Sequence, residues 1–354
     1  MRRPDAAVNI LIFKLSPLGD TVMFLPVLQA LRRHFPHWRI TAFASPVAAE
    51  LWRHHLPEAD LIVIERAALQ RAWRRPWQLA RWLHVVRQRQ PDAVLLSFDQ
   101  SSVARFLSAA SGARVRVAGA GATIKWQGGL THEVPRETSA SLADWEWTMA
   151  KTMAEALGHV WPTGPMPAPQ LSATPTAPSR ARPRIVVHAG ASRDYQRWLP
   201  ERLAELARRL SARADVVWVV RPEIAIAPPE GTQAFVAADL APFVQLLSAA
   251  DLFVGYHSGP FHLAAALGRP CLIIAGPSHP CCDPPWHRNR IRILRAPDLT
   301  CLPCDAMPVA SNRCDNRLQP MACMRYWSVE AVEKNCVEML DSSHGLRDQP
   351  SLDA

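Results

Sequence analysis

A regular alternation of short aliphatic runs with segments of helical periodicity is the feature that most constrains this chain. In the first half, aliphatic and β-branched runs occupy residues 9–15, 39–43, 61–64, 93–98 and 115–118. After the first run, apolar residues recur at spacings of three and four from Val22 to Phe35, as on one face of a helix. Alternating strands and helices predict an α/β fold built on a doubly wound parallel sheet.

The alternation occurs a second time after a break. Residues 161–184 are rich in proline and small residues without a hydrophobic period, which is typical of a linker. Beyond them, predicted strands at residues 185–188, 216–220, 252–254 and 271–274 alternate with predicted helices at residues 200–212, 240–249 and 260–267. We predict an N-terminal Rossmann-like domain over residues 1–160, a linker over 161–184, a C-terminal Rossmann-like domain over 185–327, a last helix over 328–341 and a tail over 342–354.

Two doubly wound domains also predict where a ligand binds. In such sheets the ligand lies outside the carboxyl ends of the strands, so we expect a central cleft that both domains face. The apolar run of residues 10–13 ends at Lys14, too short for a signal peptide or a membrane span, which favours a cytoplasmic protein. Cysteines in that compartment stay reduced unless they hold a metal.

The charge of the chain narrows the choice of partner. The formal net charge is +9, from 40 basic and 31 acidic side chains, and the basic excess is mostly arginine. Arginine suits a nucleic acid, an anionic membrane surface or a phosphorylated substrate, although a general arginine bias explains part of the excess. Without a helix-turn-helix pattern, an RNP motif or a zinc-finger spacing, we expect no nucleic acid partner.

Three loops at predicted strand ends carry the candidate site. The first, residues 16–20, places Asp20 at the start of the first helix. A carboxylate there is either a helix cap or a base that accepts the proton of an acceptor hydroxyl. The second, residues 188–198, contains Ser192, Arg193, Gln196 and Arg197. Arginines beside small residues suit a diphosphate, with a solvated basic loop as the alternative.

The third loop joins a predicted strand to the helix predicted over residues 260–267. Its candidate residues are His257, Ser258, Gly259 and His262. Amides at a helix N-terminus favour an anion, and a first-turn proline is typical of a helix start. His262 lies in that first turn, either as part of a phosphate site or as a structural histidine.

These loops, in this order, resemble the heptosyltransferases of glycosyltransferase family 9 over nearly the whole chain. Residues 9–33 are similar to the family's opening strand, Ser-x-x-Gly-Asp loop and helix, and residues 187–206 to its His-x-Gly-x-Ser…Arg-Trp-Pro segment. Residues 251–276 are similar to its long Ala-Asp-Leu-x-Val-Gly-x-x-Ser-Gly-Pro-x-His-Leu-Ala-Ala-Ala-Leu-Gly-x-Pro stretch.

The resemblance implies a GT-B fold and an inverting displacement at the anomeric carbon that requires no metal. It implies that Asp20 is the base and that Ser258, Gly259 and His262 bind phosphate. The implied donor is ADP-heptose or a related sugar nucleotide. The implied acceptor is a lipid-linked saccharide of the lipopolysaccharide inner core, which suggests peripheral contact with the cytoplasmic face of the inner membrane.

Two positions depart from the family pattern. Gln196 stands where the family usually has lysine, and His257 stands where it usually has aspartate. The first change removes a cation near the leaving diphosphate, and the second removes a carboxylate that could hold hydroxyls of the donor sugar. Either the donor differs from ADP-heptose, or the enzyme is slow, or the chain binds a sugar nucleotide or glycan without turnover.

A cysteine group near the C-terminus suggests a further site. Cys301, Cys304, Cys314 and Cys323 have a spacing that is compatible with a structural zinc or iron ion, with a loop of reduced thiols as the alternative. Some protein-directed relatives bind iron through C-terminal cysteines. A protein-directed heptosyltransferase is therefore a second functional hypothesis.

The segment of residues 71–89 mixes arginines with three tryptophans. We expect an amphipathic helix with Trp73 and Trp77 on one side and a basic flank. Such a helix either covers the first sheet or docks the anionic, lipid-linked acceptor at the membrane.

Overall fold

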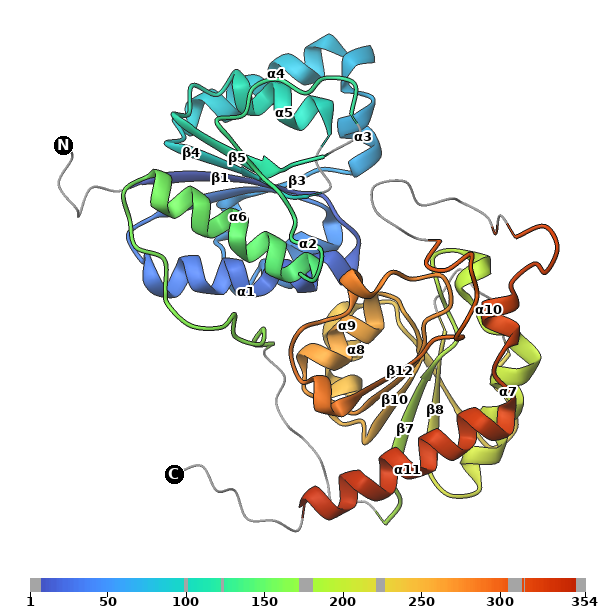
Figure 1. Cartoon of the computed structure of the whole chain (residues 1–354). Helices are drawn as coiled ribbons and strands as arrows, with labels where there is room; N and C mark the ends of the chain where they lie inside the picture. The colour runs from blue at the N-terminus through green and yellow to red at the C-terminus, as the bar shows by residue number, and fades with distance from the viewer. Residues whose placement is uncertain are drawn as a thin grey trace. The chain divides into compact units, whose positions relative to one another are not determined.

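The computed structural model describes residues 8–98, 101–121, 124–171, 181–220, 227–304, 314 and 316–347. The chain divides into two compact units, one of residues 1–169 with 281–285 and one of residues 170–280 with 286–354. Each unit is a parallel sheet between helices, coloured blue to green for the first and mostly yellow to red for the second (Figure 1). The α/β prediction is confirmed.

The first unit has a six-stranded sheet in the order β3-β2-β1-β4-β5-β6. Its strands are β1 (Asn9–Lys14), β2 (Arg39–Ala44), β3 (Leu61–Val63), β4 (Ala93–Leu96), β5 (Val115–Gly119) and β6 (His132–Val134). Its helices are α1 (Leu18–His34), α2 (Pro46–Trp52), α3 (Arg66–Gln70), α4 (Pro76–Gln88), α5 (Ser102–Ala109) and α6 (Leu142–Ala156), with short 3-10 turns η1 (Glu58–Asp60) and η2 (Ala72–Arg74). The central strands are mostly apolar because α4 and α5 cover one face and α1 and α6 the other (Figure 1).

The second unit repeats this plan in the order β12-β11-β10-β7-β8-β9. Its strands are β7 (Arg184–His188), β8 (Asp215–Val220), β9 (Gln233–Val236), β10 (Leu252–Tyr256), β11 (Cys271–Ile274) and β12 (Ile291–Leu294). Its helices are α7 (Pro200–Ser211), α8 (Leu240–Ser248), α9 (Gly259–Ala266), α10 (Ala322–Arg325) and α11 (Val329–Arg347), with 3-10 turns η3 (Asp194–Gln196), η4 (Pro280–Cys282) and η5 (Arg288–Arg290). Trp198, Trp218 and Met324 are fully buried in its core.

Two helical segments differ from the sequence prediction. The last helix, α11, continues to Arg347, beyond the end predicted at residue 341. Residues 71–89 form no single helix, because α4 begins at Pro76, a residue that favours the first turn and interrupts a helix elsewhere. Trp73 therefore lies in η2, separate from α4.

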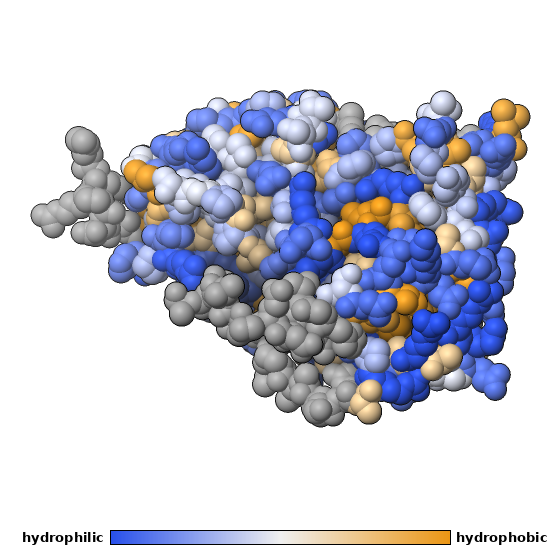
Figure 2. All heavy atoms as spheres, turned by 60° about the horizontal axis from the view of Figure 1, so that its bottom comes forward, coloured by the Kyte–Doolittle hydropathy of each residue, from blue (hydrophilic) through white to orange (hydrophobic). Residues whose placement is uncertain are grey.

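On the face drawn in Figure 2, hydrophilic residues predominate and apolar residues form small separate patches. Within the described ranges, no helix is long and apolar enough to cross a membrane.

Candidate active site

The first part of the site lies in the first unit, where β1 and β4 end. β1 pairs with β2 on one side and β4 on the other, so the sheet order reverses here. Such a switch point is where doubly wound sheets bind ligands. The loop to α1 is fixed by hydroxyl groups: Ser45 Oγ donates to the Ser16 carbonyl at 3.0 Å, and Thr21 Oγ1 donates to the Pro17 carbonyl at 3.0 Å.

Asp20 lies in the first turn of α1 and is half-buried. The N-cap residue of this helix is Pro17, with no side-chain cap hydrogen bond. The cap interpretation of Asp20 is therefore wrong, although its carboxylate still interacts favourably with the helix dipole. A half-buried carboxylate at a switch point meets the positional requirement for a base.

A buried ionic cluster beneath this loop escaped the sequence analysis. Lys14, the last residue of β1, donates from Nζ to Ser97 Oγ at 2.7 Å and to Glu146 Oε1 at 2.8 Å. Ser97 Oγ also donates to Glu146 Oε1. The side chains of Lys14 and Glu146 are fully buried, and the Lys14 ammonium lies 4.5 Å from the Phe98 ring centroid. The cluster joins β1, the end of β4 and α6 directly below the Asp20 loop.

The second part of the site lies in the second unit, where β7 and β10 run side by side. Val254 pairs with Val187, so the loops after these two strands leave the sheet at neighbouring points. A Cβ on Gly255 would lie 3.4 Å from the His188 carbonyl oxygen, which shows how closely the two strand ends approach. The structure thus brings the second and third predicted loops together.

Arg197 is the best-placed cation of the second loop. Its guanidinium donates to the Ala191 carbonyl at 3.2 Å and lies 3.2 Å from Asp194 Oδ1, while its Nε is buried without a hydrogen-bond partner in the described chain. Its charge also acts on Tyr256, at the end of β10. Burial raises the pKa of Tyr256, and the Arg197 charge opposes that rise. Arg197 is therefore held within its own loop, and its charge reaches the end of β10.

The other predicted residues of the second loop contact one another. Ser192 Oγ is 3.2 Å from Gln196 Oε1. Arg193 donates to the Tyr195 hydroxyl at 2.8 Å. At the position that the family usually fills with lysine, Gln196 thus serves to hold the loop.

The third loop forms the N-terminus of α9. Ser258 is the N-cap residue and makes no side-chain cap hydrogen bond. The amides of Phe261 and His262 donate to the Ser258 carbonyl, and Pro260 has no N–H. The Gly259 amide is therefore the first-turn donor available to an anion. The rings of His257 and the buried His262 lie 5.3 Å apart, centroid to centroid.

Of the four predicted metal ligands, Cys323 lies in α10 and the other three precede that helix in the chain. Burial raises the pKa of the Cys323 thiol to about 11, and the neighbouring Cys314 and Cys301 add to the rise. The Met321 amide donates to Cys314 Sγ at 3.3 Å, and the Cys304 thiol donates to the Cys301 carbonyl at 3.0 Å. Among the residues whose placement is described, no group of three or more His, Cys, Asp or Glu side chains is arranged to hold a metal ion.

The two parallel six-stranded sheets form a fold of the GT-B type. A family model described as glycosyltransferase family 9 (heptosyltransferase) matches residues 79–313. The chain belongs to this family and is a glycosyltransferase. A comparison with curated protein sequences gives no match.

Solved structures agree on the fold. The ADP-heptose lipopolysaccharide heptosyltransferase II of E. coli is 19% identical, with a TM-score of 0.68 over 95% of this chain and 100% of its own. The E. coli heptosyltransferase WaaC, solved with ADP-2-deoxy-2-fluoro heptose, is 17% identical, with a TM-score of 0.64 over 94% of this chain and 99% of its own. The iron-containing dodecameric glycosyltransferase TibC of enterotoxigenic E. coli H10407 is 17% identical, with a TM-score of 0.58 over 95% of this chain and 77% of its own.

Proposed function

We propose that the chain transfers heptose from ADP-heptose to a hydroxyl of the lipopolysaccharide inner core, with inversion at the anomeric carbon. The observation that carries the proposal is that the Arg197 loop and the N-terminus of α9 follow two neighbouring strands, β7 and β10, at the same edge of the sheet. A fixed guanidinium beside a free helix-terminal amide suits a diphosphate. Family membership, the ADP-2-deoxy-2-fluoro heptose bound by WaaC and the ADP-D-beta-D-heptose bound by TibC support the choice of donor.

In the proposed reaction, the second unit holds the donor diphosphate. The Gly259 amide and the dipole of α9 bind one phosphate, and Arg197 binds the other. Negative charge grows on the diphosphate as its bond to the anomeric carbon breaks, and the guanidinium stabilises that charge. Gln196 replaces the family's usual lysine, and His257 replaces its usual aspartate. Donor affinity therefore depends more strongly on Arg197.

The first unit supplies the base in this proposal. Asp20 accepts the proton of the acceptor hydroxyl while its oxygen forms the new bond to the anomeric carbon. ADP leaves from the opposite face in the same displacement, which inverts the anomeric configuration. The acceptor is anchored in the cytoplasmic leaflet of the inner membrane, so the enzyme works at the membrane surface.

The direct test is a transfer assay with ADP-heptose and lipopolysaccharide that lacks heptose. We expect ADP release that depends on the acceptor, together with a product whose anomeric configuration is opposite to that of the donor. Nucleotide binding without ADP release would instead support the non-catalytic hypothesis. Retention of configuration would exclude a single displacement assisted by Asp20.

A second candidate is transfer of heptose to a protein, with a metal bound by the cysteines. It is favoured by the proximity of Cys301, Cys314 and Cys323 and by the iron content of the structurally similar TibC. Elemental analysis of the purified protein decides whether a metal is present. One zinc or iron per chain, with an oligomeric assembly, would support this candidate, whereas metal-free protein with reactive thiols would leave the cysteines as structural residues.

Blocking the N-terminus of α9 tests the proposed phosphate site. We expect Ser258→Trp to weaken ADP binding by at least tenfold, about 1.4 kcal/mol, because an indole at the N-cap covers the Gly259 amide. Folding should change little, since Ser258 makes no side-chain cap hydrogen bond. Isothermal titration calorimetry measures the affinity.

The matched control is Ser248→Trp. Ser248 is also half-buried but ends α8, before β10 begins, and so lies at the opposite edge of the sheet. The Ser248→Trp variant should therefore bind ADP with unchanged affinity. Equal affinities of both variants would remove the start of α9 from the site.

A further inference from the structure

The first unit has a basic segment that the proposed site does not use. Residues 66–90 contain seven arginines and no aspartate or glutamate. From Gln70 to Trp77, every residue except Ala72 is exposed. In the described chain, the side chains of Arg71, Arg74 and Arg75 make no ion pair, whereas Arg89 lies 3.1 Å from Asp60. Ion pairs therefore do not account for these three arginines.

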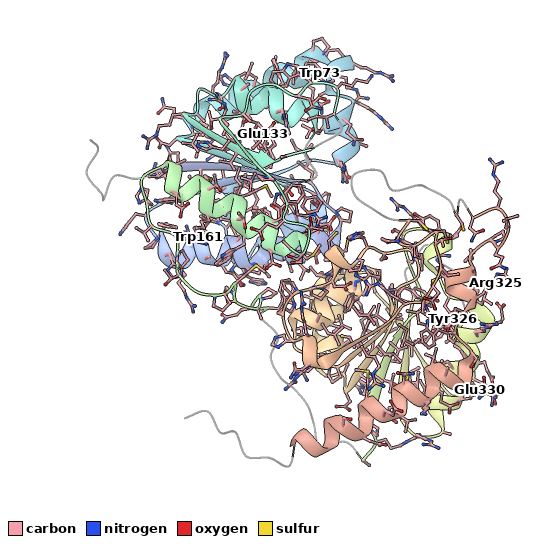
Figure 3. All side chains as sticks on the ribbon, in the orientation of Figure 1. Trp73, Glu133, Trp161, Arg325, Tyr326 and Glu330 are labelled. Carbon is pink, nitrogen blue, oxygen red and sulfur yellow. The ribbon has the colours of Figure 1, made fainter. Side chains whose placement is uncertain are left out.

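Exposed tryptophans interrupt these arginines. Trp73 is 50% exposed and Trp77 is 71% exposed. The Trp73 ring packs against Phe106 of α5 at 5.2 Å, and Phe106 packs against the exposed Trp126 at 6.2 Å, centroid to centroid. Trp73 lies at the edge of the first unit, beside α4 (Figure 3). The tryptophan–arginine surface is defined by Arg71, Trp73, Arg74, Arg75, Trp77 and Trp126.

Packing of α4 does not explain this exposure. The helix covers the sheet with Trp82 and Val86, which are both buried. Trp77, one turn earlier, lies outside that contact. Single exposed apolar residues are ordinary on a protein surface. Indole rings interleaved with arginines can bind an anionic bilayer in two ways: the indoles insert at the interface, and the guanidinium groups are attracted to the charged headgroups.

We propose that the tryptophan–arginine surface docks on the anionic headgroups of a lipid bilayer. The indoles enter the headgroup region, where tryptophan is enriched, and the guanidinium groups bind lipid phosphates. The single sign of the charge matches an anionic surface, and no carboxylate within residues 66–90 would repel it. The inference rests on the proposed function only in that docking would bring the enzyme to a membrane-anchored acceptor.

Vesicle sedimentation tests the docking surface. We expect the full chain to bind vesicles of phosphatidylcholine and phosphatidylglycerol, to bind pure phosphatidylcholine vesicles weakly, and to be released by salt. Arg74→Gln with Arg75→Gln should weaken binding by about thirtyfold, since each arginine near an anionic surface contributes roughly fivefold. Trp73→Ala with Trp77→Ala should weaken binding by at least about tenfold through loss of interfacial burial.

Matched variants of the second unit serve as controls. Arg213→Gln with Arg317→Gln removes the same charge from exposed positions, and Tyr326→Ala removes an aromatic ring that is 52% exposed. These variants should bind anionic vesicles within about twofold of the unaltered chain, well under 1 kcal/mol. The proposal would be overturned if the test variants and the control variants lost vesicle affinity equally. Absence of vesicle binding, or binding of an RNA oligomer in place of vesicles, would also overturn it. ADP affinity is measured separately and tests the proposed function. Failure of the docking proposal therefore does not imply failure of the proposed function, and the reverse also holds.

Discussion

Asp20→Asn should lower the turnover of heptose transfer by about a hundred- to ten-thousandfold, the usual contribution of a general base. Asparagine keeps the shape of the side chain but cannot accept the acceptor proton at neutral pH. The folded state should lose only about 0.3–1 kcal/mol, because the carboxylate lies in the first turn of α1 and Asp20 is not the N-cap residue. ADP affinity should stay nearly constant, since we place the diphosphate in the second unit.

The control is Glu201→Gln, which removes a carboxylate from the first turn of α7. It should cost a similar small amount of stability and leave turnover unchanged. If Asp20→Asn retains turnover within a few fold, Asp20 is structural. The base would then be sought at Asp194 or His257 among the described residues, or at Asp99, which lies outside them.

Glu146→Ala should destabilise the first unit by about 3–5 kcal/mol, because it removes a carboxylate that pairs with the fully buried Lys14 ammonium at 2.8 Å. Hydrogen exchange of peptides from β1 and α6, measured at increasing urea concentration, gives the free energy of unfolding of this unit alone. Glu155→Ala is the control on the same helix, since its pair with Lys151 is 3.9 Å long and half exposed. That variant should cost less than about 1 kcal/mol.

A double variant separates charge from packing in this cluster. Replacing Lys14 by Met and Glu146 by Leu removes both charges and keeps most of the buried volume. The double variant should recover most of the stability lost in Glu146→Ala, since apolar replacement of a whole buried pair is often neutral or better. Equal stability losses in Glu146→Ala and Glu155→Ala would contradict the proposed importance of the buried pair.

The sequence predicted the central strands because they are buried on both faces and therefore form continuous apolar runs. It missed β6, β9 and β12, which lie at sheet edges or are only partly buried and contain residues such as Glu133, Gln233 and Arg292. It also missed the division of residues 71–89, although Pro76 was a visible signal.

The candidate site was predictable where its residues adjoin strand ends. The loops with Arg197 and Ser258 could be identified because each follows a strand and precedes a helical turn. The role of Lys14 could not, because its partner Glu146 lies 132 residues away and only the folded sheet brings them together. In the sequence, Lys14 only marks the end of an apolar run.

Isothermal titration of the chain with ADP, UDP and GDP tests the proposed choice of donor. We expect one ADP site, at least tenfold tighter than the site for either other nucleotide, a difference of about 1.4 kcal/mol. Arg197→Gln should weaken that site as Ser258→Trp does, because both substitutions act on the same diphosphate. Tighter binding of UDP or GDP, or ADP binding that neither substitution changes, would contradict it.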